Sequence, residues 1–256
     1  MLAVACGPGR SVVTRAAARS PLQLLVPRNH GHAVWAFLGS HGGGLVDGDE
    51  TSLHVEVGAG ASALIATQAS TKVYRSPRGC RQRVAAEVGA GGLLIIMPDP
   101  TVCFAGARFE QEVVVRLGVD ASVVLVDAIT CGRAARDERW AFARYRSTLA
   151  VSRGDLPIVR DTVELDPAHG SIALRLGRFA ALATVIAIGP QASLAMVSPV
   201  RTAGDHAPWL AVASPLAEGT LVRAAAASVG ELHRGLRALL DGIPALLGDD
   251  PFARKW

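Results

Sequence analysis

The feature that most constrains the fold is a weak internal repeat in the middle of the chain. Glycine-containing turns begin at Gly58, Gly89 and Gly118, so successive turns are 31 and 29 residues apart. A segment of alternating polar and apolar residues precedes each turn, and a short apolar run follows it. Such segments are typical of half-buried and fully buried strands. The segments are residues 53–57, 63–66, 83–88, 93–96, 112–117 and 123–126. The repeat therefore predicts three strand–turn–strand units.

Strand pairs without helices between them predict an all-β fold. Glycine permits the positive φ of a tight hairpin turn, so we interpret each unit as a hairpin. A further pair, at residues 145–151 and 158–165, flanks a turn at 152–155. Three repeats are too few to distinguish a sandwich from a solenoid-like stack. The predicted fold is mainly β, an elongated stacked-sheet or solenoid-like domain over residues 1–256 with a C-terminal helix packed on it.

Irregular polar segments follow the apolar runs, and each begins nine residues after the turn glycine. They are residues 67–75, 98–101 and 127–133. Because equal phase in a repeat means equal position in the stack, we expect these segments to lie along one edge of the molecule. Polar loops on a rigid scaffold commonly carry function.

The C-terminal part follows a helical period. Ser228 and Glu231 form a capping-box pattern, and an apolar helical face then continues to Gly248. Pro244 is expected to kink the helix or to restart it as a short second helix. We expect this segment, about residues 228–247, to pack on the sheet, and docking of a partner is the alternative.

Composition excludes several classes of function. Charged residues are 19% of the chain and the net charge is +4, without a long run of like charge. Aromatic residues are 5%, too few for a stacking platform for single-stranded nucleic acid. The longest apolar stretch, residues 179–189, is too short to span the ~30 Å core of a bilayer. The four cysteines lack C-x-x-C spacing. We therefore expect a reduced, cytoplasmic protein that binds neither nucleic acid nor membrane.

Two short patterns suggest chemistry that the rest of the chain does not support. Residues 41–44 (HGGG) match an esterase oxyanion loop, but the G-x-S-x-G nucleophile elbow is absent. Phosphate-binding glycine motifs are absent as well. His30 and His32, with Cys6, are candidate ligands for a borderline metal ion, or two loop histidines in water. An esterase and a nucleotide-binding protein are therefore not expected.

Two carboxylates interrupt apolar strands. Asp127 lies within the run 123–129, and Asp161 lies within 158–163. A carboxylate there is costly unless it is paired or hydrated. One interpretation pairs each with a buried arginine, Arg133 or Arg160. The other places both in an internal polar channel with Asp49, where carboxylate oxygens pass a divalent cation without trapping it.

Four segments together resemble the urease accessory protein family UreD, called UreH in some organisms. In chain order they are residues 43–49 (GGLVDGD), 67–75 (TQASTKVYR), 104–108 (FAGAR) and 132–138 (GRAARDE). The second segment is the most specific, and the match extends over residues 43–165. Asp99-Pro100 departs from the family, in which many members have Gln-Glu.

The resemblance implies a scaffold without catalytic activity. Members bind apo-urease and, through UreF, recruit the GTPase UreG, so that nickel reaches the urease active site. The implied fold is elongated and mostly β, with a polar internal tunnel and transient Ni²⁺ rather than a tightly bound cofactor. Asp49, Asp127 and Asp161 are the candidate metal path. The candidate motif or partner-contact residues are Gly43, Gly44, Gly48, Thr67, Gln68, Thr71, Lys72, Tyr74, Arg75, Gly106, Gly132, Arg133 and Glu138. The alternative is a β-solenoid protein-binding module without a metal role.

Overall fold

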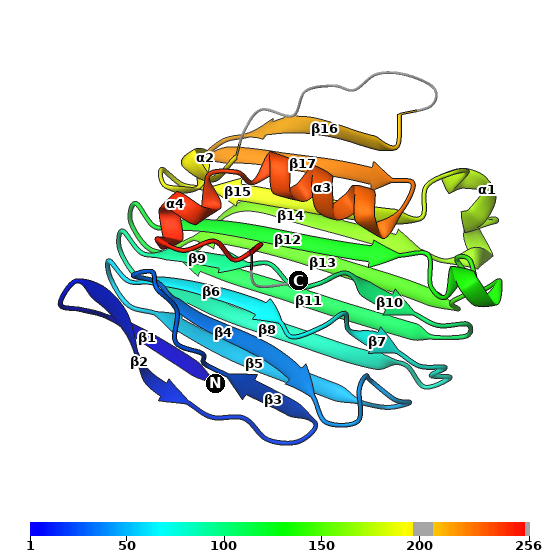
Figure 1. Ribbon diagram of the computed structural model, residues 1–256, viewed down its shortest axis with the longest axis horizontal. Coiled ribbons are helices and arrows are strands. Elements are labelled where there is room, and N and C mark those ends of the chain that lie inside the picture. Colours follow the sequence, from blue (N-terminus) through cyan, green and yellow to red (C-terminus); the bar gives the residue numbers. More distant parts are fainter. Residues whose placement is uncertain (197–206, 254–256) are drawn as a thin grey trace.

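Two β-sheets are stacked face to face, and helices cover the outer side of one of them (Figure 1). The computed structural model describes residues 1–196 and 207–253. Sheet A contains, in spatial order, β14 (Leu156–Leu165), β13 (Arg144–Arg153), β11 (Arg108–Leu117), β8 (Cys80–Val88), β5 (Glu50–Val57), β1 (Leu2–Gly7) and β2 (Arg10–Ala16). Sheet B contains β16 (Trp209–Leu216), β17 (Gly219–Ala226), β15 (Ala181–Ile188), β12 (Ser122–Thr130), β9 (Leu93–Ile96), β6 (Ser62–Thr67), β4 (Val34–Ser40) and β3 (Leu22–Leu25). The mainly β prediction is confirmed.

The central repeat forms a solenoid-like stack of coils. Each glycine turn carries the chain from sheet A to sheet B, from β5 to β6, from β8 to β9 and from β11 to β12. Strands of the same type then pair in parallel from coil to coil: β5 pairs with β8 and β8 with β11, and β6 pairs with β9 and β9 with β12. The prediction of hairpins at these turns is therefore wrong, because the two strands that flank each turn lie in different sheets.

The turn glycines serve the close approach of neighbouring coils. The backbone N–H of Gly89 donates to the carbonyl of Val57, and that of Gly118 donates to Val88, at 2.7 Å each. A Cβ atom on Gly89 would lie 2.6 Å from the backbone nitrogen of Ala59 in the preceding turn. These glycines are thus explained by coil stacking rather than by hairpin geometry.

Antiparallel strands flank the coils. β13 and β14 form the hairpin that the sequence predicts at residues 145–165, and β13 joins the stack in parallel with β11. On sheet B, β15, β17 and β16 follow β12 in antiparallel order. The short strands β7 (Lys72–Val73) and β10 (Thr101–Cys103) extend sheet B at one edge.

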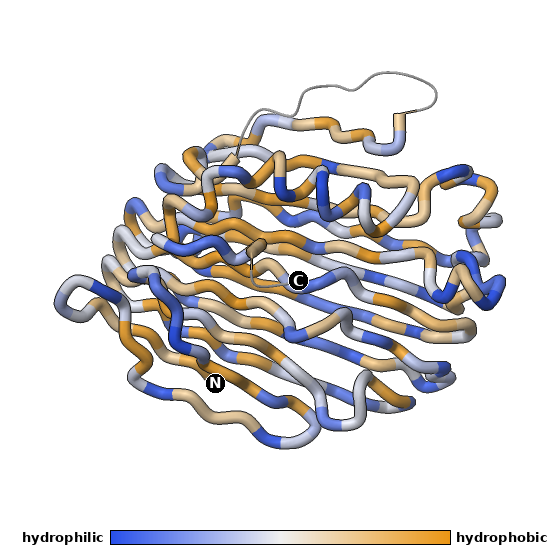
Figure 2. Tube along the Cα trace, in the orientation of Figure 1, coloured by the Kyte–Doolittle hydropathy of each residue, from blue (hydrophilic) through white to orange (hydrophobic). Residues whose placement is uncertain are grey.

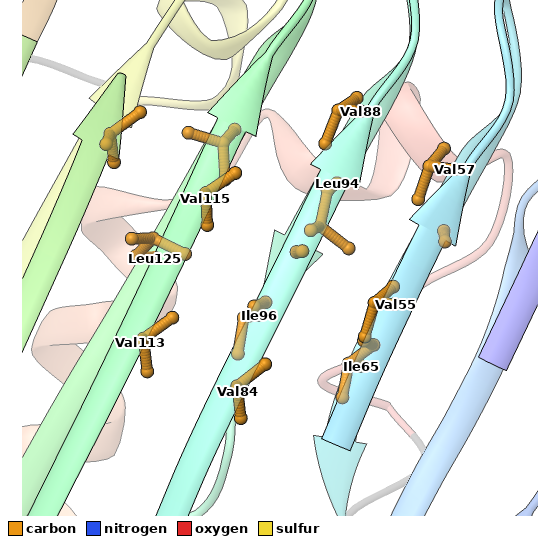
Figure 3. Packing of buried hydrophobic residues seen from close by; sticks show 14 of the residues in the cluster. Val55, Val57, Ile65, Val84, Val88, Leu94, Ile96, Val113, Val115 and Leu125 are labelled. Atoms are coloured by element: carbon orange, nitrogen blue, oxygen red, sulfur yellow. The ribbon is translucent and has the colours of Figure 1, made fainter. Parts of the chain in front are cut away.

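The apolar core has layers on both sides of sheet B. One cluster fills the space between the sheets near the glycine turns, and Figure 3 shows its side chains on consecutive coils. A second cluster lies between sheet B and the helices. The strands β6, β9 and β12 are consequently buried along their whole length, whereas β5 and β8 alternate because the outer face of sheet A is exposed. In Figure 2 the hydrophilic colour gathers in the loops at the right-hand edge, beyond β7 and β10 of Figure 1.

The C-terminal helical segment divides into α3 (Val229–Leu239) and α4 (Ile243–Leu247). The Ser228 hydroxyl accepts the N–H of Glu231 at 3.1 Å, as the capping pattern predicts. Pro244 lies in the first turn of α4, so the helix restarts there. Leu232, Leu236 and Leu239 are buried against sheet B. The expected packing of this segment on the sheet is confirmed.

The remaining helical elements are short. They are η1 (Ala134–Arg136), η2 (Pro167–His169), α1 (Ile172–Leu176) and α2 (Ala192–Ala195). None of the helices in the described ranges has the length and apolar character needed to cross a membrane.

Candidate functional site

The polar segments that follow the apolar runs meet at one edge of sheet B. There β7 pairs in parallel with β10, and β10 pairs in parallel with β12. Leu45, from the glycine-rich segment 43–49, bridges to Val73 of β7. The prediction that these segments lie along one edge is confirmed.

Side chains from several motif segments interlock at this edge. The rings of Tyr74 and Phe104 pack edge to face with centroids 5.1 Å apart, and the Arg133 guanidinium lies 4.2 Å from the centre of the Phe104 ring. Arg133 pairs with Glu138, which also accepts the backbone N–H of Ala105 at 3.2 Å. The hydrogen bond from Arg133 lowers the pKa of Glu138. Tyr74, Arg133 and Glu138 therefore brace the loops against one another.

Two motif glycines are required by close backbone contacts. A Cβ atom on Gly44 would lie 2.6 Å from the carbonyl oxygen of Lys72. Gly132 has a φ of +99°, and a Cβ atom there would lie 2.9 Å from the carbonyl oxygens of both Cys103 and Glu138. The other motif glycines, Gly43, Gly48 and Gly106, also have positive φ.

The segment 67–75 is held mainly by its backbone. Gln68 donates its N–H to Leu38 at 3.0 Å, and the carbonyl of Thr71 accepts the N–H of Val102 at 2.9 Å. The buried Thr67 hydroxyl accepts the N–H of Asp99 at 2.8 Å and lies 3.3 Å from its carboxylate. Lys72, Tyr74 and Arg75 remain exposed at this edge.

Polar side chains also form a layer between the two sheets. On sheet A, Thr51, Gln82, Gln111 and Ser147 are consecutive partners in register across β5, β8, β11 and β13. On sheet B, Asp127 is in register with Thr184 of β15, and Thr184 with Arg223 of β17. One polar row on each sheet thus crosses the otherwise apolar interior.

Asp127 lies at the centre of this layer. The Tyr145 hydroxyl donates to its carboxylate, 3.1 Å from each oxygen, and the Gln111 amide donates at 2.6 Å. Burial raises the pKa of Asp127, and hydrogen bonds from neighbours that include Tyr145 and Gln111 act in the opposite direction. Burial also raises the pKa of Tyr145. No ion pair to Asp127 is present among residues 1–196 and 207–253.

The arginine partners predicted for the two carboxylates are wrong. Arg133 pairs with Glu138, and Arg160 lies 3.7 Å from Glu112. Asp161 does pair with an arginine, but that residue is Arg223. Because Asp161 is on β14 of sheet A and Arg223 on β17 of sheet B, this ion pair bridges the two sheets.

Three cavities follow one another along the polar layer. A cavity of about 190 Å³ lies at the motif edge, lined by residues that include Gly44, Thr67 and Lys72. It shares Thr67 and Gln82 with a void of about 30 Å³ between the sheets. That void shares Asp127 with a cavity of about 350 Å³, lined also by Tyr145, Thr184 and Arg223. We call the row of shared polar residues Thr67, Gln82 and Asp127 the polar route, although apolar side chains line most of the cavities of about 30 Å³ and 350 Å³.

Asp49 lies apart from this route. Its carboxylate accepts the N–H of Val46 at 2.8 Å and so holds the loop that precedes β5. The described residues that line the three cavities do not include Asp49. The structure therefore brings Asp127 and Asp161 to one region and leaves Asp49 at another.

The candidate metal ligands near the N-terminus do not converge. The backbone N–H of His30 donates to Asp249, and that of His32 donates to Leu247, while the exposed Cys6 thiol donates to Gly7. In the part of the chain that the structure describes, no group of three or more His, Cys, Asp or Glu side chains is placed to hold a metal ion.

Sequence reasoning missed several members of the polar layer. Thr51, Gln82 and Gln111 are 31 and 29 residues apart, which are the spacings of the turn glycines. A polar residue at the same inward position of every coil was thus a usable signal. Thr184 and Arg223 lie outside the repeat, and their sequence carries no comparable signal.

Comparisons with known proteins agree with this geometry. The family described as UreD urease accessory protein matches residues 1–256. The chain belongs to the UreD family. It is 56% identical over 252 residues to the urease accessory protein UreD of Sorangium cellulosum (strain So ce56), covering 97% of this chain and 81% of that protein. It is 47% identical over 254 residues to UreD of Anaeromyxobacter sp. (strain Fw109-5), covering 96% and 85%.

A more distant relative comes from a plant. Urease accessory protein D of Arabidopsis thaliana is 40% identical over 189 residues, covering 71% of this chain and 64% of that protein. In this member of the UreD family, the segments that carry the resemblance converge on the edge where the polar route opens.

Proposed function

We propose that this chain is a urease accessory protein that helps deliver nickel to apo-urease. It acts as a scaffold without catalytic activity, together with UreF and, through UreF, the GTPase UreG. Membership of the UreD family supports the role in urease maturation. The observation that carries the nickel role is the buried carboxylate of Asp127, which lines two neighbouring cavities and accepts hydrogen bonds from Tyr145 and Gln111.

The chemistry of the polar layer suits a cation that must pass and not remain. Its described polar side chains offer carboxylate, hydroxyl and amide oxygens, whereas imidazole and thiolate are the ligands that hold nickel more firmly. The raised pKa of Asp127 means that burial favours its neutral form, which further weakens retention of a cation. Weak oxygen ligands that follow one another along the polar layer therefore support transfer of a cation rather than its storage.

The motif edge is the proposed contact with partners. Lys72, Tyr74 and Arg75 are exposed there, next to the cavity that Lys72 lines. The braced loops present these side chains on a rigid surface, which favours specific recognition. A stable interface would bury at least ~1,000 Å² in total. The low share of charged residues supports such burial.

The proposal is tested in cells that express the complete set of urease genes with this gene deleted. Deletion should abolish nickel-dependent urease activity, and the wild-type gene should restore it. Asp127→Asn combined with Asp161→Asn should lower activity while the protein still co-purifies with UreF and apo-urease. Activity that survives deletion would leave only the β-solenoid binding module without a metal role.

Asp49 provides a contrast within the same experiment. Because its carboxylate holds the loop before β5, Asp49→Ala should act on the loop and on assembly. Reduced co-purification with UreF and apo-urease would fit this bracing role. Reduced urease activation with normal co-purification would instead indicate that Asp49 belongs to the metal path.

A further inference from the structure

The cavity of about 350 Å³ is lined by Arg223, which forms an ion pair with Asp161 that joins the two sheets. Arg223 Nη2 contacts Asp161 Oδ1, and Arg223 Nη1 donates to the Thr184 hydroxyl at 3.4 Å. The side chain of Asp161 is 13% exposed, whereas that of Arg223 is 48% exposed. The guanidinium therefore lies on the solvent side of the pair and covers the carboxylate.

Thr184 separates this ion pair from Asp127 on sheet B. Arg223, Thr184 and Asp127 are consecutive partners in register across β17, β15 and β12. Arg223 and Asp127 both line the cavity of about 350 Å³. The charge of Asp161 contributes to the raised pKa of Asp127, so the two carboxylates interact. The positive charge of Arg223 thus contacts Asp161 directly and lies two strands away from Asp127, at one end of the polar route.

A second ion pair between the sheets differs from the first in its bonding. Arg153 of β13 contacts Glu218, in the turn between β16 and β17, at 2.6 Å. Arg153 also donates to the backbone carbonyls of Gly118 and Ala121, so its release would break these hydrogen bonds as well as the ion pair. The guanidinium of Arg223 donates to the side chains of Thr184 and Asp161, so it can be released at lower cost.

We propose that Arg223 is the electrostatic gate at this end of the route. Paired with Asp161, it occupies the carboxylate and repels a divalent cation. When it swings outward, Asp161 joins Asp127 and the hydroxyls of Thr184 and Tyr145 as oxygen ligands for the cation. A guanidinium stays charged at every physiological pH, so the gate opens by movement and not by deprotonation. The inference rests on the proposed nickel function and assigns its control to one residue.

The gate is tested by the binding of Ni²⁺ alone to the purified complex of this chain with UreF, measured by isothermal titration calorimetry. Arg223→Gln removes the competing charge and should bind Ni²⁺ about tenfold more tightly than wild type, a coupling usual for neighbouring charged groups. Asp161→Asn, which leaves the arginine unpaired, should bind more weakly. The double variant should return towards wild type.

Control variants separate the gate from a general loss of structure. Arg223→Lys retains the charge and should bind Ni²⁺ like wild type. Arg153→Gln removes the other inter-sheet pair, away from the cavity, and should also bind like wild type. The gate is refuted if Arg223→Gln binds like wild type, or if its gain persists in the double variant. Should Arg223→Gln fail to fold, unchanged binding by Asp161→Asn refutes the gate equally.

The two proposals fail in different ways. If the wild-type gene restores urease activity but wild type, the two single variants and the double variant bind Ni²⁺ with the same affinity, the gate is wrong and the nickel role stands. If deletion of the gene leaves urease activity intact, the nickel role itself is wrong.

Discussion

The two ends of the space between the sheets are built by the same three coils but differ in chemistry. Near the glycine turns, every coil contributes apolar side chains, among them Val57, Val88 and Leu117 (Figure 3 labels the first two). Towards the motif edge, the same inward face carries Thr51, Gln82 and Gln111. The backbone pairing is the same in both halves. One polar position in each coil therefore places a polar row on sheet A next to the apolar core.

This difference separates stability from function along the strands. The apolar half gains from close packing and excludes water. The polar half must satisfy hydrogen bonds in a buried layer, which costs stability unless every group is paired. Substitutions in the two halves should therefore have different signatures, and each prediction below tests that division.

The largest loss of stability is expected in the apolar half. Leu94 is fully buried between the sheets, and Leu94→Ala should lower the free energy of unfolding by about 2–5 kcal/mol, because it removes packing and leaves a cavity. Urea denaturation of the purified protein measures this change. Val119→Ala, at an exposed turn position, is the control and should change stability by less than about 0.5 kcal/mol. Lower nickel-dependent activation per folded molecule in Leu94→Ala would contradict the division.

A smaller loss is expected where the polar half begins. Thr67→Val removes the hydroxyl that accepts the N–H of Asp99 and should cost about 1–3 kcal/mol, because it leaves a part-buried donor without that acceptor. Thr67→Ser keeps the hydroxyl and is the matched control. Both are compared by urea denaturation, and equal stability of the two variants would show that the hydrogen bond contributes nothing.

The repeat predicts part of this fold and not the rest. The strand segments and their common polar edge depend on a period that one sequence displays. The sequence does not show which strands pair with each other. A glycine turn between short strands has the same sequence pattern whether those strands form a hairpin or pair with strands of the next coil. The continuous apolar runs at 63–66 and 93–96 do carry a signal, since they fit a parallel sheet covered on both faces better than a hairpin.

The candidate site was predictable to a similar extent. A carboxylate that interrupts an apolar strand identifies Asp127 without any structure. Its neutral partners Tyr145 and Gln111 could not be chosen, because they come from sheet A across the interior. Arg223 lies 62 residues from Asp161 and on the other sheet, so only the assembled stack reveals that pair.

The third prediction concerns Asp127→Asn, a substitution that should increase stability as the pH rises instead of lowering it. Burial raises the pKa of Asp127 above its ordinary value of 3.8, so the folded chain holds this proton more tightly than the unfolded chain. The carboxyl therefore stabilises the fold less as the pH rises from the pKa of Asp127 in the unfolded chain to its pKa in the folded chain. Asp127→Asn removes this dependence and should gain stability relative to wild type as the pH rises. Unfolding by urea from about pH 4 to pH 8 measures the difference.

The control for this prediction is a carboxylate with a lowered pKa. Hydrogen bonding from Arg78 lowers the pKa of Asp47 below its ordinary value of 3.8, so this carboxylate is ionised in the folded and the unfolded chain above about pH 5. The difference in stability between Asp47→Asn and wild type should therefore stay nearly constant from about pH 5 to pH 8. A constant difference between Asp127→Asn and wild type across the range would show that burial does not raise the pKa of Asp127.

The smallest effect is expected on the outer face of sheet A, one residue away from the polar layer. Glu110 precedes Gln111 on β11 and lies 4.0 Å from Arg81 and 3.6 Å from Arg146. Its side chain is 44% exposed, so solvent screens both ion pairs. Glu110→Gln should change the free energy of unfolding by less than about 0.5 kcal/mol.

Gln111→Leu, on the inward face, removes the donor to Asp127 and Ser147 and should cost more. Urea denaturation of the two variants compares adjacent positions of one strand, and a larger cost for Glu110→Gln would mean that the outer charges, not the inner polar layer, stabilise this part of the stack.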